Sequence, residues 1–161
     1  MGIPLATRVR DALREVVLMM QRQYLNRVWK MDIGEGTAIS GSAKLDKTNP
    51  RGIHIGTYSV VTFGAAILTH DYVNQRNADV RIGNNCFIGA HSIILPGVTI
   101  GDGCIIAAAS VVARDVPARS LVAGNPARVV EHDVQTTRYG VRVPAFRASP
   151  IMATREPQAC Q

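Results

Sequence analysis

Residues 81–112 read "RIGNNCFIGAHSIILPGVTIGDGCIIAAASVV", and an aliphatic side chain returns in this stretch at every sixth position. The positions are Ile82, Ile88, Ile94, Ile100, Ile106 and Val112. The same period runs upstream, with two changes of phase, through Ile33, Ile39 and Leu45 and then Ile55, Val61 and Ile67. A six-residue repeat predicts a parallel β-helix, because each hexad supplies one short strand and one bend.

A second position of the repeat supports this prediction. Four residues after the aliphatic one, a small side chain follows in ten of the twelve hexads: Thr37, Ala43, Ser59, Ala65, Cys86, Ser92, Val98, Cys104, Ser110 and Val116. A narrow prism of stacked coils needs such an alternation of large and small inward side chains. Cys86 and Cys104 are therefore interpreted as compact core residues. Cys160 lies in the C-terminal tail, and without a CxxC pair neither a disulfide framework nor a zinc site is indicated.

The chain divides into an N-terminal amphipathic helix (1–30), the repeat domain (31–130) and a C-terminal tail (131–161) without hexads. Residues 5–29 are predicted to be helical, because an apolar stripe recurs at steps of three and four residues. The stripe comprises Val9, Leu13, Val16, Met20, Tyr24 and Val28. We expect it to pack on the main domain or on a partner subunit. The alternative is contact with anionic lipid, since residues 1–30 carry a charge of +4 out of a net +6.

The longest early apolar run, "VVLMM" at 16–20, is too short for a signal sequence or a transmembrane helix. We therefore expect a cytoplasmic location, which includes the inner face of the membrane. The rhythm of the repeat is interrupted at 45–54 and at 67–81. Extra residues can only loop out of a coil, and loops on a rigid scaffold often carry function. The second interruption contains His70.

These features together resemble the hexapeptide-repeat acyltransferases, and "ILTHDY" (67–72) and "AGNPAR" (123–128) resemble their sugar and polysaccharide O-acetyltransferase branch. The resemblance implies a left-handed parallel β-helix of about five coils. It also implies acetyl-CoA as co-substrate and a sugar or surface-polysaccharide precursor as acceptor. The family's sites lie in clefts between adjacent prisms, so a homotrimer is implied as well.

The resemblance assigns His70 as the catalytic base and the backbone N–H of Ala90 as the donor to the oxyanion. An imidazole suits the task, because it titrates near neutral pH and can take the proton of a hydroxyl during attack on a thioester. Asp46 matches a position that contacts the acceptor. Asp71 either orients the imidazole or caps its loop.

The cofactor groove is implied by a different set of positions. Phe87 stands where the family commonly has Trp, near the pantetheine arm. Ala108 is the expected backbone contact, Ala113 and Arg114 match positions at the far end of the groove, and Arg128 matches a residue that meets a CoA phosphate.

Two other functions stay open at this stage. A non-catalytic β-helix scaffold would need neither the looped-out histidine nor "AGNPAR". A metal enzyme of the γ-carbonic-anhydrase type would need three histidine ligands, and no third ligand fits beside His54 and His91, so no metal is expected. Many sugar acetyltransferases have Pro directly after the catalytic histidine, where this chain has Asp71, which puts the acceptor in doubt more than the reaction.

Overall fold

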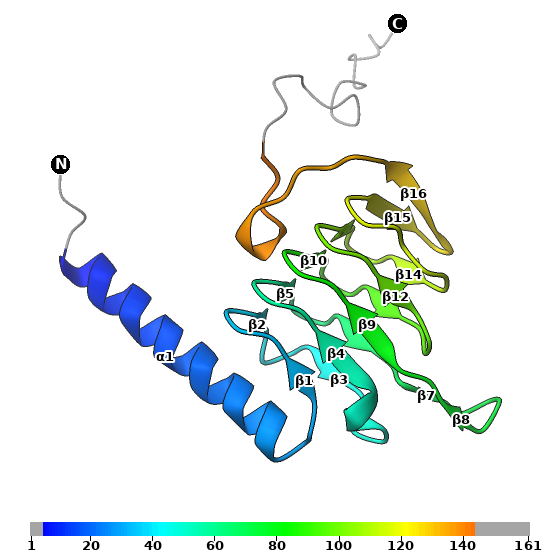
Figure 1. Cartoon of the computed structure of the whole chain (residues 1–161), viewed down its shortest axis with the longest axis horizontal. Coiled ribbons are helices and arrows are strands. Elements are labelled where there is room, and N and C mark those ends of the chain that lie inside the picture. Colours follow the sequence, from blue (N-terminus) through cyan, green and yellow to red (C-terminus); the bar gives the residue numbers. More distant parts are fainter. Residues whose placement is uncertain (1–4, 144–161) are drawn as a thin grey trace, which may run out of the picture.

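The computed structural model describes residues 5–143, and the chain winds as a left-handed parallel β-helix of triangular section (Figure 1). Sheet A contains β1 (Asp32–Ile33), β4 (Ile53–Ile55), β9 (Val80–Ile82) and β12 (Thr99–Ile100). Sheet B contains β2 (Ala38–Ile39), β5 (Val60–Val61), β10 (Phe87–Ile88), β13 (Ile105–Ile106), β15 (Leu121–Gly124) and β16 (Ala127–Glu131). Sheet C contains β3 (Lys44–Leu45), β6 (Ala66–Ile67), β11 (Ile93–Ile94) and β14 (Val111–Val112).

The chain visits the three sheets in a fixed order, A, then B, then C, and each round makes one coil. Four coils are complete, and a fifth consists of the bridge between Ile100 and Val116 followed by β15. The antiparallel strand β16 then closes this end of sheet B. The prediction of about five coils is confirmed. We call the three edges of the prism the AB, BC and CA corners, after the sheets that they join.

The core of the prism is built from the two positions of the repeat. Eleven of the twelve aliphatic positions are buried, and Ile88, Ile94 and Ile106 are 0% exposed. Nine of the ten small positions are buried as well. The exceptions, Ala43 and Leu45, belong to the first coil, which has a neighbouring coil on one side only. The six-residue rhythm therefore describes the packing of the whole prism.

Helix α1 (Leu5–Arg27) lies beside the first coils (Figure 1). Asn26 exchanges two hydrogen bonds of 3.0 Å with the backbone of Ile33, and Gln21 donates one to the carbonyl of Ile39. Leu25 and Trp29 pack against the core. No helix in the described range is both long and apolar enough to cross a membrane.

The face of α1 that packs is not the stripe predicted from the sequence. The predicted stripe is exposed throughout: Val9, Leu13, Val16, Met20, Tyr24 and Val28. The expectation that it packs on the chain's own main domain is therefore wrong. The physical reason is that α1 is apolar on two sides, and the narrower side, with Leu18 and Leu25, meets the prism.

The C-terminal tail, as far as it is described, runs along the AB corner. A short 3₁₀ helix, η2 (Arg138–Gly140), forms part of this path. The hydroxyl of Thr136 donates to the carbonyl of Asn85, and the N–H of Tyr139 donates to the carbonyl of Tyr58. The tail thereby ties the upper coils to the lower ones. Cys160 lies outside the described residues.

Candidate active site

Both interruptions of the repeat lie at the CA corner, on neighbouring coils. The first follows β3 and contains a 3₁₀ turn, η1 (Pro50–Gly52). The second follows β6 and forms a two-stranded antiparallel hairpin of β7 (His70–Asp71) and β8 (Arg76–Asn77). The hairpin projects away from the prism (Figure 1). It carries His70 in its first strand, where the chain leaves the wall.

Asp46 joins the two interruptions through its carboxylate. One oxygen accepts hydrogen bonds from the N–H groups of Thr69 and His70, at 3.0 and 2.9 Å. The other accepts from the N–H of Thr48 at 2.8 Å. Burial raises the pKa of Asp46, but these backbone donors outweigh burial and hold the pKa below its ordinary value of 3.8. Asp46 therefore fixes the backbone that carries His70, a role that its sequence position did not indicate.

A second pair of contacts strengthens this junction. Thr69 is fully buried, and its hydroxyl donates to the carbonyl of Asn49 at 2.7 Å. The side-chain amide of Asn49 donates back to the carbonyl of Thr69. The residue directly before His70 is thus held from both sides. The sequence offered only the polar character of "LDKTNP" and "THD" as a signal for this arrangement.

The imidazole of His70 is half-buried and makes no hydrogen bond to another residue within 5–143. Its neighbour is the ring of Tyr72, edge-to-face at 6.1 Å between centroids. Tyr72 is 77% exposed and was not singled out from the sequence. Residues two positions apart in a strand point to the same side, so the spacing of His70 and Tyr72 is the pattern that could have identified Tyr72 as a neighbour of His70.

Asp71 caps the hairpin turn. Its carboxylate accepts from the backbone and the side chain of Asn74 and pairs with Arg76 at 3.5 Å. Its pKa is lowered, first by the side-chain amide of Asn74 and then by the N–H of the same residue. Of the two roles considered for Asp71, the geometry therefore favours the cap over the orientation of His70.

Ala90 and Ala108 lie at the BC corner on successive coils, and the N–H of Ala109 donates to the carbonyl of Ala90 at 2.8 Å. Within the described chain, the N–H groups of Ala90 and Ala108 donate no hydrogen bond. The backbone N–H of Phe63, at the equivalent turn position one coil below, also donates no hydrogen bond within the described residues. The free N–H is therefore a property of this kind of turn. A free backbone donor at Ala90 suits the oxyanion role predicted for it.

The remaining predicted groove residues are spread over the upper coils. Ala113 and Arg114 are exposed at the CA corner, two coils above the hairpin. Arg128 is exposed on β16, opposite Ala123. Phe87 lies on the outer side of β10, where the backbone of Gly140 covers it. Phe87 is therefore partly enclosed by the tail, and its contact with the pantetheine arm stays a prediction.

One chain does not bring His70 and Ala90 together. In sheet C, Ala66 of β6 pairs with Ile93 of the parallel strand β11. His70 follows Ala66 by four positions and so lies past the end of these strands, whereas Ala90 precedes Ile93 by three positions and so lies before their start. The two residues thus lie on opposite edges of sheet C. Asp46, Asp71 and Arg114 share the CA corner with His70, whereas Ala108 shares the BC corner with Ala90.

The histidines considered for a metal site lie apart. His54 is on the outer face of sheet A, with Nδ1 3.1 Å from Asp32 and Nε2 3.4 Å from Asp79. His91 is at the BC corner, edge-to-face with Phe63. In residues 5–143 no group of three or more His, Cys, Asp or Glu side chains could hold a metal ion. The metal-enzyme alternative gains no support from this arrangement.

The two core cysteines are placed as predicted. Cys86 and Cys104 are free thiols with no exposed surface. A hydrogen bond with Cys104, together with burial, raises the pKa of the Cys86 thiol. The same hydrogen bond lowers the pKa of the Cys104 thiol to about 7. Because both side chains are fully enclosed in the prism, where a substrate cannot reach them, neither cysteine competes with His70 for a catalytic role.

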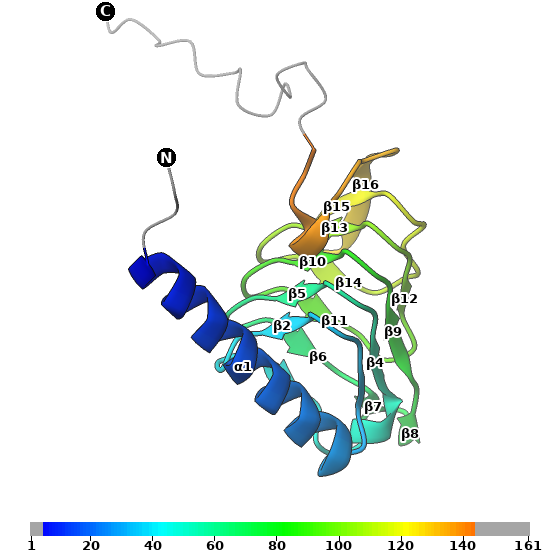
Figure 2. The same ribbon diagram turned by 60° about the vertical axis from the view of Figure 1, so that its left-hand side comes forward.

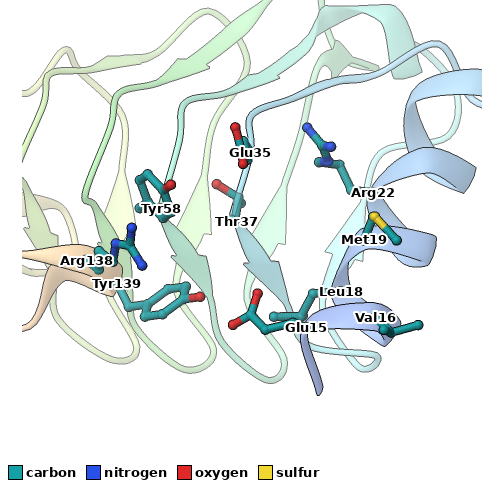
Figure 3. Close-up of a pocket in the computed structure, with 11 residues that line it drawn as sticks. Glu15, Val16, Leu18, Met19, Arg22, Glu35, Thr37, Tyr58, Arg138 and Tyr139 are labelled. Atoms are coloured by element: carbon teal, nitrogen blue, oxygen red, sulfur yellow. The ribbon is translucent and has the colours of Figure 1, made fainter. Parts of the chain in front are cut away.

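A pocket of about 410 Å³ opens at the AB corner, between α1, the coils and the tail (Figure 3). Its walls include Glu15, Arg22, Glu35, Tyr58 and Tyr139. The guanidinium of Arg138 lies 4.1 Å from the centre of the Tyr58 ring. None of the predicted site residues lines this pocket, which belongs to a different corner from both His70 and Ala90.

The comparisons with known proteins agree with the repeat and the fold. Residues 79–114 match the family described as bacterial transferase hexapeptide (six repeats). YvoF of Bacillus subtilis, which is provisionally named an acetyltransferase, is 37% identical over 103 residues, covering 63% of this chain and 60% of that protein. CapG of Staphylococcus aureus is 48% identical over 94 residues, covering 52% of this chain and 55% of that protein. The chain thus spans 60% or less of the length of these two relatives.

Solved structures show the same fold. A maltose O-acetyltransferase from Clostridium difficile is 26% identical with a TM-score of 0.56, over 70% of this chain and 74% of that one. The hexapeptide-repeat acetyltransferase VCA0836 of Vibrio cholerae, in complex with acetyl-CoA, is 29% identical with a TM-score of 0.53, over 62% and 58%. In its repeat and in its coils the chain is therefore similar to the hexapeptide-repeat transferases, and the match to their family model covers residues 79–114.

Proposed function

We propose that the chain is an acetyl-CoA-dependent O-acetyltransferase that acts on a hydroxyl of a sugar or a surface-polysaccharide precursor. The observation that carries the proposal is His70, whose backbone is fixed by Asp46 while its imidazole is left without a partner in the described residues. The similarity to a maltose O-acetyltransferase and to an acetyl-CoA complex supports the choice of acceptor and donor.

In the proposed reaction, His70 accepts the proton of the acceptor hydroxyl as its oxygen attacks the thioester carbonyl carbon. The N–H of Ala90 donates to the oxyanion of the tetrahedral intermediate. The C–S bond then breaks, and His70 returns the proton to the departing thiolate. The products are an O-acetyl ester and free CoA, so neither a metal nor an oxidant is needed to balance the step.

The proposed site needs a second copy of the chain, because His70 and Ala90 lie on opposite edges of sheet C. In a homotrimer with threefold symmetry, the CA corner of one prism can face the BC corner of the next. Asp46 and Asp71 would then border the acceptor, and Phe87, Ala108, Ala113, Arg114 and Arg128 the CoA groove. We place this assembly in the cytoplasm, where acetyl-CoA is available.

The first test is a calorimetric titration of the purified full chain with acetyl-CoA, with light scattering on the same sample to measure the oligomeric state. We expect saturable binding by a trimer. Arg128→Gln is expected to weaken it about tenfold, since it removes a charge-assisted contact to phosphate. Arg27→Gln, at another exposed arginine on α1, is the matched control and should leave binding unchanged.

The second test measures the release of the CoA thiol with a panel of acceptors that contains mono- and oligosaccharides and L-serine. Release with sugars, and its loss in His70→Gln, would support the proposal. An intact trimer that does not bind acetyl-CoA would overturn it and leave the scaffold function. Release with L-serine alone would overturn the sugar acceptor while keeping the transferase chemistry.

A further inference from the structure

Helix α1 has an exposed apolar face that runs along its whole length. We call it the outer face, formed by Val9, Leu13, Val17, Met20, Tyr24 and Val28, each between 51% and 62% exposed. Val16, at the edge of this face, lines the pocket beside the prism. At 1.5 Å per residue the outer face spans about 29 Å. Figure 2 shows α1 lying along one side of the coils, and only its other side, with Leu18 and Leu25, meets them. Such a long apolar strip is unusual on a surface that faces water alone.

The charges around the outer face have one sign. At 100° per residue, Arg27 falls within the arc of the outer face and Arg10 at its margin. The two acidic residues of α1, Asp11 and Glu15, fall on the opposite arc, and Glu15 lines the pocket beside the prism (Figure 3). Arg10 does pair with Asp11 at 3.0 Å, but both side chains are well exposed, which makes this a weak pair.

We propose that the outer face of α1 docks on an anionic lipid surface. A bilayer supplies both parts of the match: its interior takes the apolar side chains, and its headgroups take the guanidinium groups. The long apolar stems of Arg10 and Arg27 can lie against lipid while their charged ends reach the headgroups. The helix would lie in the interface, because it is not apolar enough to cross the membrane.

The charge pattern distinguishes lipid from a second copy of the helix. Two outer faces packed together would bring Arg27 of both copies into one apolar contact without a carboxylate of that face to pair it, whereas Arg10 keeps its pair with Asp11. Burying unpaired like charges is unfavourable. A lipid surface carries the opposite charge and avoids this cost. Docking there would hold the transferase next to lipid-linked acceptors, although it does not depend on the acetyltransferase activity.

The experiment is co-sedimentation of the full chain with vesicles, in two compositions: phosphatidylcholine alone, and phosphatidylcholine with phosphatidylglycerol. We expect binding to the anionic vesicles, weakened by salt, and none to the neutral ones. The triple variant Leu13→Gln, Val17→Gln, Met20→Gln should lose about a hundredfold or more in partitioning. Arg27→Gln should lose about fivefold.

Matched controls are Val73→Gln and Val130→Gln, which remove apolar side chains that are 89% and 51% exposed elsewhere, and Arg51→Gln, which removes an exposed charge. These variants should partition like the parent chain. The proposal is overturned if the parent ignores anionic vesicles, or if the triple variant binds them as well as the parent. A triple variant that changes the oligomeric state in light scattering, with no lipid binding by the parent, would assign the outer face to a second copy and also overturn it.

Discussion

Replacing Asp46 with Asn tests whether this carboxylate holds the loop that carries His70. Asp46 accepts three backbone hydrogen bonds, from Thr48, Thr69 and His70, at 2.8, 3.0 and 2.9 Å. In the Asn variant, the amide oxygen can keep the bonds to Thr69 and His70. The amide nitrogen then faces the N–H of Thr48, so two donors meet and the third bond is lost.

The magnitude follows from the kind of bond that changes. A hydrogen bond to a charged group contributes roughly 1.5–3 kcal/mol and a neutral one roughly 0.5–1.5 kcal/mol. In Asp46→Asn the hydrogen bond from Thr48 to a charged oxygen is lost, and the hydrogen bonds from Thr69 and His70 then end on a neutral oxygen. Because Asp46 is only half-buried and the N–H of Thr48 can bind water instead, about half of the loss is recovered. We therefore expect the junction to be destabilised by about 2 kcal/mol.

The assay is amide hydrogen exchange at Thr69 and His70, combined with steady-state kinetics. A loss of about 2 kcal/mol corresponds to about a 30-fold loss of protection at these two amides. We expect kcat to fall, because His70 is less well positioned, while the KM for acetyl-CoA stays constant. The control is Asp71→Asn, which alters the half-buried carboxylate of the hairpin turn; because its partners are Asn74 and Arg76 and not the amides of Thr69 and His70, it should change protection there by less than about threefold.

Two outcomes would refute this reasoning. Unchanged protection in Asp46→Asn would mean that the three hydrogen bonds do not hold the loop. A raised KM for the acceptor with an unchanged kcat would mean that Asp46 binds the acceptor, as the family resemblance implied, and does not act through the backbone of His70.

Three further outcomes are expected. His70→Gln should keep the proposed trimer and acetyl-CoA binding but lower kcat by about 10²–10⁴, measured by thiol release. The pKa of Asp46 is lower in the folded chain than its ordinary value of 3.8. The stabilisation by its carboxylate is therefore present above pH 3.8 and is lost as the pH falls through the folded pKa. Hydrogen-exchange protection at His70 should accordingly fall in acid in the parent chain but not in Asp46→Asn. Ile88→Ala, at a fully buried position, should lower the free energy of unfolding by about 2–5 kcal/mol in urea titrations, whereas Val130→Ala, at an exposed one, should change it by less than about 0.5 kcal/mol.

The prism could be predicted from the sequence because its packing repeats. Each coil sits on a nearly identical coil, so one rule for the inward side chain holds at Ile88, Ile94 and Ile106 alike. Handedness could not be derived in this way, since the inward pattern is the same for either hand, and it came from the resemblance. The position of His70 was also readable, because a residue that breaks the register must leave the wall.

The contacts inside the interruptions could not be predicted, because a loop follows no repeat. Asp46 and His70 are 24 positions apart, and only the stacking of two consecutive coils makes them neighbours. The polar residues of "LDKTNP" are equally suited to an ordinary turn. The sequence therefore marked Asp46 as a candidate for the acceptor, whereas the structure shows what its carboxylate binds in the chain itself.

Helix α1 shows why amphipathic patterns do not by themselves identify a buried face. Periodicity selects the side with more apolar residues, but the side that contacts the first coils is the one with Leu25 and the amide of Asn26. Hydrogen bonds from Gln21 and Asn26 to the backbone of the first coils decide which side turns inward. The wider apolar side then remains outside, and Arg27 falls on the same arc as Val9. A helix anchored by polar bonds and apolar on its free side has the form expected of a surface that meets another phase or another molecule.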